Sequence, residues 1–188
     1  MAVLEAFDVG VVIDPGLAAG KDMFIDLLHA ARGRKQRWVA ARAGIVFNFD
    51  DLEVALLFPF QELDPGAEAN DNSVIFRLSY GDFAALFTGD APASVEQELV
   101  ARHGTRLRAT LLKVGHHGSV TSTSDSLLVA LRPEMALVSA GRHNRYGHPA
   151  PSVLARLTRY GVRVLRTDEH GDITLRAHRD GRVEVLTR

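Results

Sequence analysis

The chain has 188 residues, no cysteine and a formal net charge of −1. This length suits one domain with its own core. The missing cysteine excludes disulfides, thiolate nucleophiles and cysteine-based zinc sites. The near-neutral charge excludes a global basic field of the kind that attracts nucleic acid.

The first third of the chain predicts short strands and one helix. A strand is expected over 8–16, where a Pro-Gly turn ends it, and a helix over 21–34. Strands are expected next at 37–42, 44–49 and 52–60. A polar loop rich in Pro, Gly, Asn and Asp follows over 61–72.

The rest of the chain begins with a hairpin and then alternates helices and strands. Residues 72–90, "NSVIFRLSYGDFAALFTGD", predict a hairpin about Gly81-Asp82. A helix is expected over 91–104, with Ser94 and Gln97 at capping-box spacing. Strands then follow at 109–114, 135–139 and 162–165, helices at 124–131 and 152–160, and a last hairpin about Asp180-Gly181. This order predicts a layered α/β or α+β sandwich in a single domain over 1–188.

Targeting signals and membrane segments are not expected. The longest apolar runs fall well short of the roughly 20 residues that a membrane helix needs. The N-terminus carries Glu5 and Asp8 and lacks the basic region of a secretory signal. We expect a cytoplasmic protein as written, or a membrane-associated one if it is part of a longer protein.

Basic residues cluster in "ARGRKQR" (31–37) and "RHGTRLR" (102–108). Each cluster is typical of a solvated helix end or loop, and contact with nucleic-acid phosphate is the alternative interpretation.

Three polar loops each follow an apolar strand. In "FTGD" (87–90), Asp90 is either a carboxylate at a helix N-terminus or a ligand at the end of a strand. In "GHHGS" (115–119), His116 and His117 are either turn residues or a metal ligand with a supporting neighbour. In "SAGRHNRYGHPAPS" (139–152), His148 precedes Pro149, so its backbone is expected to be extended.

The three loops together predict a site at one edge of a sheet. One aspartate with two or three histidines suits Zn²⁺ or Mn²⁺. Such a metal lowers the pKa of bound water and supplies hydroxide for hydrolysis.

Four segments carry a family resemblance in their order and spacing: 70–90, "LLKVGHHGS", "SAGRHNRYGHP" and "VLRTDEHGDITL". They resemble the metallo-β-lactamase-fold domain of the ComEC-type DNA-internalisation competence proteins. The resemblance covers residues 70–176 strongly and 2–60 loosely. It implies an αββα sandwich with a metal site of one or two ions, Zn or Mn, on one edge.

The resemblance also implies residue roles. Asp90 matches the metal-bridging aspartate, and His116 or His117 the late histidine ligand, with His116 favoured because it directly follows the strand and glycine. His148 matches a substrate-facing or proton-donating residue, so His148 and Asp90 are the expected catalytic pair. Residues that support the ligands or contact substrate are expected at Asn70, Asn72, Ser73, Ser119 and Tyr146.

The family's principal ligand motif, HxHxDH, occurs nowhere in the sequence. The resemblance places that motif and an opening hairpin ahead of "AFDVGVVIDPG" (6–16). We therefore expect a domain truncated on its N-terminal side, with an incomplete metal site and a sheet edge that a partner covers.

The main functional hypothesis is a metal-dependent phosphodiesterase or nuclease associated with DNA uptake. One alternative is a catalytically inactive fragment or interaction domain. Another is a hydrolase of small esters or lactones, because a fold does not fix a substrate.

Overall fold

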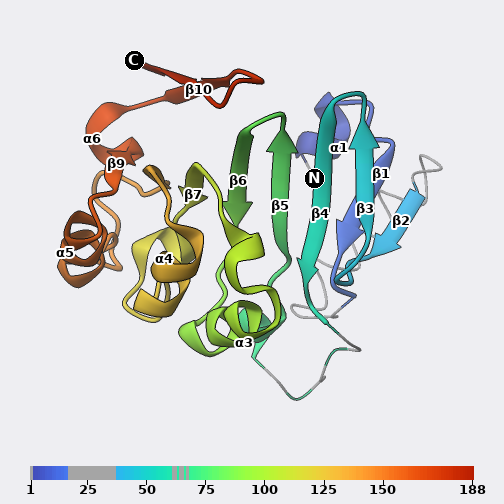
Figure 1. The fold of residues 1–188 in the computed structure, drawn as a ribbon, viewed down its shortest axis with the longest axis horizontal. Coiled ribbons are helices and arrows are strands. Elements are labelled where there is room, and N and C mark those ends of the chain that lie inside the picture. Colours follow the sequence, from blue (N-terminus) through green and yellow to red (C-terminus); the bar gives the residue numbers. More distant parts are fainter. Residues whose placement is uncertain (1, 17–36, 61–62, 64–65, 67) are drawn as a thin grey trace.

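The structure is a computed structural model that describes residues 2–16, 37–60, 63, 66 and 68–188. The helix predicted over 21–34, the basic residues 31–36 and part of the loop over 61–72 lie outside these residues. A seven-stranded mixed sheet is the centre of the fold, with the strand order β3-β4-β5-β6-β7-β8-β9 (Figure 1). Its strands are β3 (Val46–Phe49), β4 (Leu52–Phe58), β5 (Ile75–Tyr80), β6 (Phe83–Phe87), β7 (Leu111–Lys113), β8 (Met135–Val138) and β9 (Arg163–Arg166).

The strand pairing changes from antiparallel to parallel at β6. Strands β3 to β6 form an antiparallel meander, and the predicted turn at Gly81-Asp82 joins β5 to β6. Strands β6 to β9 are parallel, because a helix returns the chain after each of β6, β7 and β8. These helices are α3 (Ala93–His103), α4 (Asp125–Leu131) and α5 (Pro151–Arg159). All four strands of the parallel half therefore end at the same edge.

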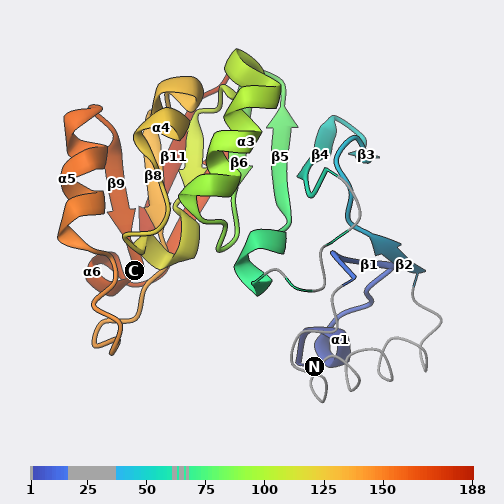
Figure 2. The ribbon, with the colours of Figure 1, turned by 90° about the horizontal axis from the view of Figure 1, so that it is seen from below.

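The three helices pack side by side on one face of the sheet (Figure 2). Their buried leucines and valines meet the alternate residues of the strands, such as Leu86, Leu112 and Ala136, in the main core. This arrangement follows from the sequence, because buried parallel strands are apolar on both faces.

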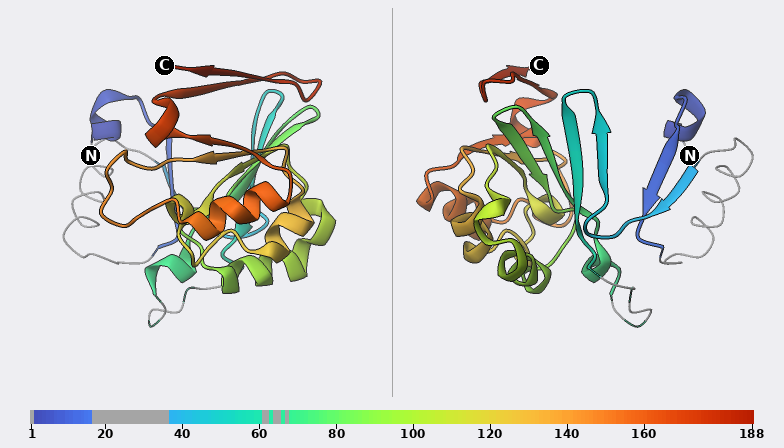
Figure 3. Two further views of the ribbon diagram at one scale, coloured as in Figure 1. Left: turned by 90° about the vertical axis from the view of Figure 1, so that its left-hand side faces the viewer. Right: turned by 45° about the vertical axis from the view of Figure 1, so that its right-hand side comes forward.

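The opposite face carries a smaller apolar cluster. Phe83, Ala85, Leu111 and Met135 pack there against residues of the C-terminal hairpin, which consists of β10 (Ile173–Ala177) and β11 (Val183–Thr187). Figure 3 shows this hairpin across the sheet from the helices. The helices, the central sheet and the C-terminal hairpin thus form three successive layers of the predicted αββα sandwich.

The remaining elements are short. A two-stranded parallel ribbon of β1 (Val11–Asp14) and β2 (Arg37–Ala40), with α1 (Ala2–Ala6), lies beyond β3 (Figure 3). Single turns occur at η1 (Ala69–Asn72), η2 (Gly104–Leu107), η3 (Gly115–Gly118) and α6 (Thr167–His170). None of the helices in the described ranges is both long and apolar enough to cross a membrane.

Candidate functional site

The predicted polar loops meet at the carboxyl edge of the parallel strands. Asp90 follows β6, the two histidines follow β7, and His148 follows β8. The backbone N–H of His116 donates to the carbonyl of Gly89 at 2.9 Å, which joins the first two loops. The N–H of Ala150 donates to the carbonyl of Gly118 at 2.8 Å, which joins the second loop to the third. The sequence prediction that these residues share one edge of the sheet is therefore confirmed by the strand topology.

The histidine loop has an uncommon backbone. His116 (φ 47°, ψ 42°) and His117 (φ 55°, ψ 19°) are both left-handed, in the 3-10 turn η3. Each such residue costs about 1–2 kcal/mol relative to a right-handed one. Two in succession turn the chain sharply at the end of β7, and the surrounding hydrogen bonds hold that turn in place.

His117 has an oriented ring. Its Nδ1 lies 2.7 Å from the carbonyl oxygen of Ser139. Because a carbonyl only accepts, Nδ1 carries a proton, and in the neutral ring the lone pair lies on Nε2. This is the arrangement by which a backbone carbonyl orients a histidine that binds a metal.

His116 is held less closely. Its Nδ1 lies 3.5 Å from the Thr121 hydroxyl, and its ring centroid lies 5.9 Å from that of His148. The sequence interpretation favoured His116 as the ligand, whereas the anchored ring belongs to His117. Both remain candidate ligands.

Asn144 fixes the backbone at His148. The Asn144 amide donates to the His148 carbonyl at 2.6 Å, and its oxygen accepts from the His148 N–H at 3.0 Å. No role was predicted for this asparagine from the sequence. A signal was present in its position four residues before His148, since asparagine side chains bond readily to nearby backbone in loops.

The His148 side chain is partly buried. Its Nδ1 is buried and has no hydrogen-bond partner among the described residues. Burial lowers the pKa of His148, and the charges of His116 and His117 lower it further, so the neutral ring predominates at neutral pH. The exposed Tyr146 ring stacks on it, with centroids 6.0 Å apart.

A pocket of about 230 Å³ opens between the second and third loops. His117 and His148 face it from opposite loops, and Asn144 and Tyr146 also line it. The pocket therefore brings together one histidine with a free Nε2 and a second, neutral histidine.

Asp90 is half-buried beside a lysine of the neighbouring strand. The Lys113 ammonium donates to the carbonyl of Val114 at 3.0 Å. Burial lowers the pKa of Lys113, and the negative charge of Asp90 opposes that shift. Lys113 lies inside the "LLKVG" segment, and no role was predicted for it from the sequence.

The residues predicted to support the ligands or contact substrate lie in or beside the loops at this edge of the sheet. Asn72 is buried and donates to the carbonyl of Glu68 at 3.3 Å, within the turn that also contains Asn70. Ser73 packs against the loop of Asp90, because a Cβ built on Gly89 would lie 3.3 Å from the Cβ of Ser73. Ser119 is buried, with its hydroxyl 3.0 Å from that of Thr121.

A buried carboxylate anchors the hydroxyl-rich segment after the histidines. Glu96 of α3 accepts the backbone N–H groups of Thr123 at 2.6 Å and Ser124 at 2.7 Å. Arg156 of α5 donates to the carbonyl of Thr123 at 2.9 Å. Burial raises the pKa of the Glu96 carboxyl above its ordinary value, against the opposing effects of Ser124, Thr123 and Arg156.

The residues at this edge do not complete a metal centre. Within the described ranges, no three His, Asp or Glu side chains lie close enough together to bind one ion. A catalytic zinc site takes three protein ligands. The donors present, Asp90 and an oriented histidine, fit part of such a site.

The chain has the metallo-β-lactamase fold, and polar residues gather at one edge of its central sheet. No family model matches the chain. Among solved structures it is similar to CmlA, a diiron β-hydroxylase from Streptomyces venezuelae, with a TM-score of 0.51 and 13% identity. That match covers 87% of this chain and 36% of the other, and at this identity it shows the fold alone.

The sequence relatives are competence proteins of the ComEC type, so the predicted resemblance is confirmed. It is 39% identical over 150 residues to ComE operon protein 3 of Bacillus subtilis (strain 168), which covers 80% of this chain and 19% of that protein. It is 33% identical over 173 residues to competence protein ComA of Neisseria gonorrhoeae, covering 92% of this chain and 23% of that protein. The chain thus spans about a fifth of the length of these relatives.

Proposed function

We propose that this edge is part of the active site of a metal-dependent phosphodiesterase that acts on DNA during its uptake. The observation that carries the proposal is the convergence of Asp90, His117 and His148 from three successive loops, with His117 oriented through Nδ1. The relatives named as competence proteins support the link to DNA uptake.

The residues have distinct roles in this proposal. Asp90 and His117, or His116, would supply ligands to a zinc or manganese ion. When bound, the metal activates water for attack on phosphorus. His148, held by Asn144, hydrogen-bonds to the leaving group from the opposite wall of the pocket.

A non-catalytic role is the second candidate, and it is favoured by the described residues, which supply fewer than three ligands for one ion. In that case the 188 residues act as an interaction domain of the competence system. A partner chain would then cover the sheet edge at β3, where Val46 and Phe49 are exposed.

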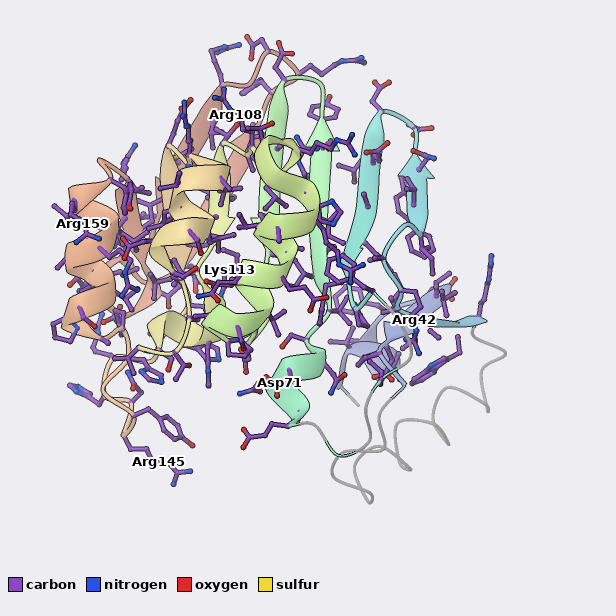
Figure 4. All side chains as sticks on the ribbon, turned by 60° about the horizontal axis from the view of Figure 1, so that its bottom comes forward. Arg42, Asp71, Arg108, Lys113, Arg145 and Arg159 are labelled. Atoms are coloured by element: carbon purple, nitrogen blue, oxygen red, sulfur yellow. The ribbon has the colours of Figure 1, made fainter. Side chains whose placement is uncertain are left out.

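Metal content and DNA cleavage separate the two candidates. The purified chain is loaded with Mn²⁺ or Zn²⁺, passed through a desalting column, and assayed on single- and double-stranded DNA. The proposal expects retained metal and cleavage that Asp90→Ala abolishes and Asp71→Ala leaves unchanged. Asp71 is a suitable control because it is a carboxylate in η1, at the same edge of the sheet (Figure 4).

The assay has two contrary outcomes. If the chain retains no metal and does not cleave DNA, the phosphodiesterase proposal is wrong and the non-catalytic role is supported. Turnover of a neutral lactone or thioester, without cleavage of DNA, would instead identify a small-molecule hydrolase on the same fold.

A further inference from the structure

A second pocket lies at the other end of the parallel strands. It has a volume of about 400 Å³ and is bordered by the residues just before β7 and β8 and by the start of β6. Figure 4 labels Arg108 at this end, far from Asp71 and Arg145 at the histidine edge. The pocket is therefore separate from the candidate active site.

Three arginines converge on this pocket from three elements. Arg77 comes from β5, Arg108 follows η2, and Arg132 follows α4. Within the described part of the chain, none of the three forms an ion pair with a carboxylate. Three cations that share one pocket without a direct ion pair repel one another, and an anion bound between them relieves that repulsion.

Arg77 is fixed in place. Its Nε and Nη2 both donate to the carbonyl of Arg108 at 3.2 Å, and its Nη1 donates to the hydroxyl of Ser79. These acceptors are neutral, so they orient the guanidinium without cancelling its charge. Burial lowers the pKa of Arg77, and the charge of Glu53 only opposes that shift.

Two carboxylates, Asp82 and Glu134, also line the pocket. Both residues are exposed, and neither is ion-paired with the three arginines. The residues that line the pocket thus carry three positive and two negative charges, and Glu53, whose charge acts on Arg77, lies outside that lining.

We propose that this pocket binds a phosphate group. A guanidinium matches a phosphate in geometry, since its N–H groups bond in parallel pairs to the phosphate oxygens. Arg77 is the preorganised contact, and Arg108 and Arg132 close on the same group from the solvent side. The site does not depend on a metal at the histidine edge, so it stands independently of the proposed phosphodiesterase activity.

Titration calorimetry in the presence of a chelator tests the proposal. Two probes are used: inorganic phosphate, and a short oligothymidylate with unphosphorylated ends. We expect saturable binding that weakens on the order of tenfold in Arg108→Met, the effect of losing one charge-assisted contact. Arg77→Met should act at least as strongly, and Arg108→Met carries the test if the Arg77 variant does not fold.

Arg106→Met is the matched control. Arg106 belongs to η2, two residues before Arg108, is exposed and does not line the pocket. Its replacement removes the same charge and should leave the affinity within about twofold. Glu134→Gln removes a negative charge from the pocket and should tighten binding about two- to fivefold.

The two probes identify the source of the phosphate. Binding of inorganic phosphate alone points to a free phosphate or a phosphomonoester. Binding of the oligothymidylate, weakened by Arg108→Met, points to the backbone of a nucleic acid. The proposal is overturned if neither probe binds saturably, or if Arg106→Met weakens binding as much as Arg108→Met.

Discussion

Removing the Glu96 carboxylate should destabilise the protein severely. Glu96→Ala leaves the buried N–H of Thr123 and the partly buried N–H of Ser124, now bonded at 2.6 and 2.7 Å, without an acceptor. Each buried, unsatisfied N–H costs about 1–3 kcal/mol. We therefore expect the free energy of unfolding to fall by about 3–5 kcal/mol, once the cavity left by the side chain is included.

Urea denaturation followed by circular dichroism measures this loss. Glu96→Gln keeps one acceptor, so it should cost about 1–3 kcal/mol and still give a folded protein. The control is Glu98→Ala, which removes an exposed carboxylate from the same helix and breaks only its pair with Arg102. It should change stability by less than about 1 kcal/mol. If Glu96→Ala behaved like the control, the buried network would not hold the segment as described.

The pH dependence gives a second check on Glu96. Its pKa is raised above the ordinary value of 4.5, so the folded state binds the proton more tightly than the unfolded state. The stability contributed by this proton is complete below pH 4.5 and is lost as pH rises through the raised pKa. Glutamine does not titrate, so the stability gap between the wild type and Glu96→Gln should narrow with rising pH. If this difference in the free energy of unfolding instead widened as pH rises, the folded state would favour the ionised form of Glu96.

Two further predictions concern the contacts that join the loops of the site. Gly118→Ala places a Cβ 2.6 Å from the Cβ of Pro149, whereas Gly147→Ala, also at positive φ, meets nothing within 4 Å. By urea denaturation, Gly118→Ala should therefore be less stable than Gly147→Ala by about 1–3 kcal/mol, and equal losses would exclude the clash as the cause. Thr167→Val removes a hydroxyl that accepts from the Ala140 N–H and donates to its carbonyl, both at 2.9 Å. It should lower the free energy of unfolding by about 1–3 kcal/mol, and Thr167→Ser, which keeps the hydroxyl, should retain most of that stability.

The order of the main strands and helices in the described ranges followed from the sequence. Alternating apolar residues before a Gly-Asp turn predicted the hairpin of β5 and β6, and the strand and helix alternation predicted the parallel half. The shared edge of Asp90 and the histidines followed from that alternation, because parallel strands end together.

The residues that hold the site in shape were harder to predict. Glu96 bonds to residues 27 and 28 positions further along the chain, and local spacing does not reveal so distant a partner. The predicted capping by Ser94 was wrong, because α3 begins at Ala93 with Pro92 as its N-cap. The turns η1 to η3 and α6 were missed, since single turns are too short for a hydrophobic period and depend on tertiary contacts.

The left-handed backbone at His116 and His117 lowers conformational stability at the two positions that carry the candidate ligand side chains. Glycine adopts these φ values without strain, so on conformational grounds each histidine is a less stable choice by about 1 kcal/mol. Selection for stability alone would favour glycine or asparagine at positions 116 and 117, and both imidazoles would then be lost. In the proposed site, this loss of stability accompanies two imidazoles that glycine would not supply.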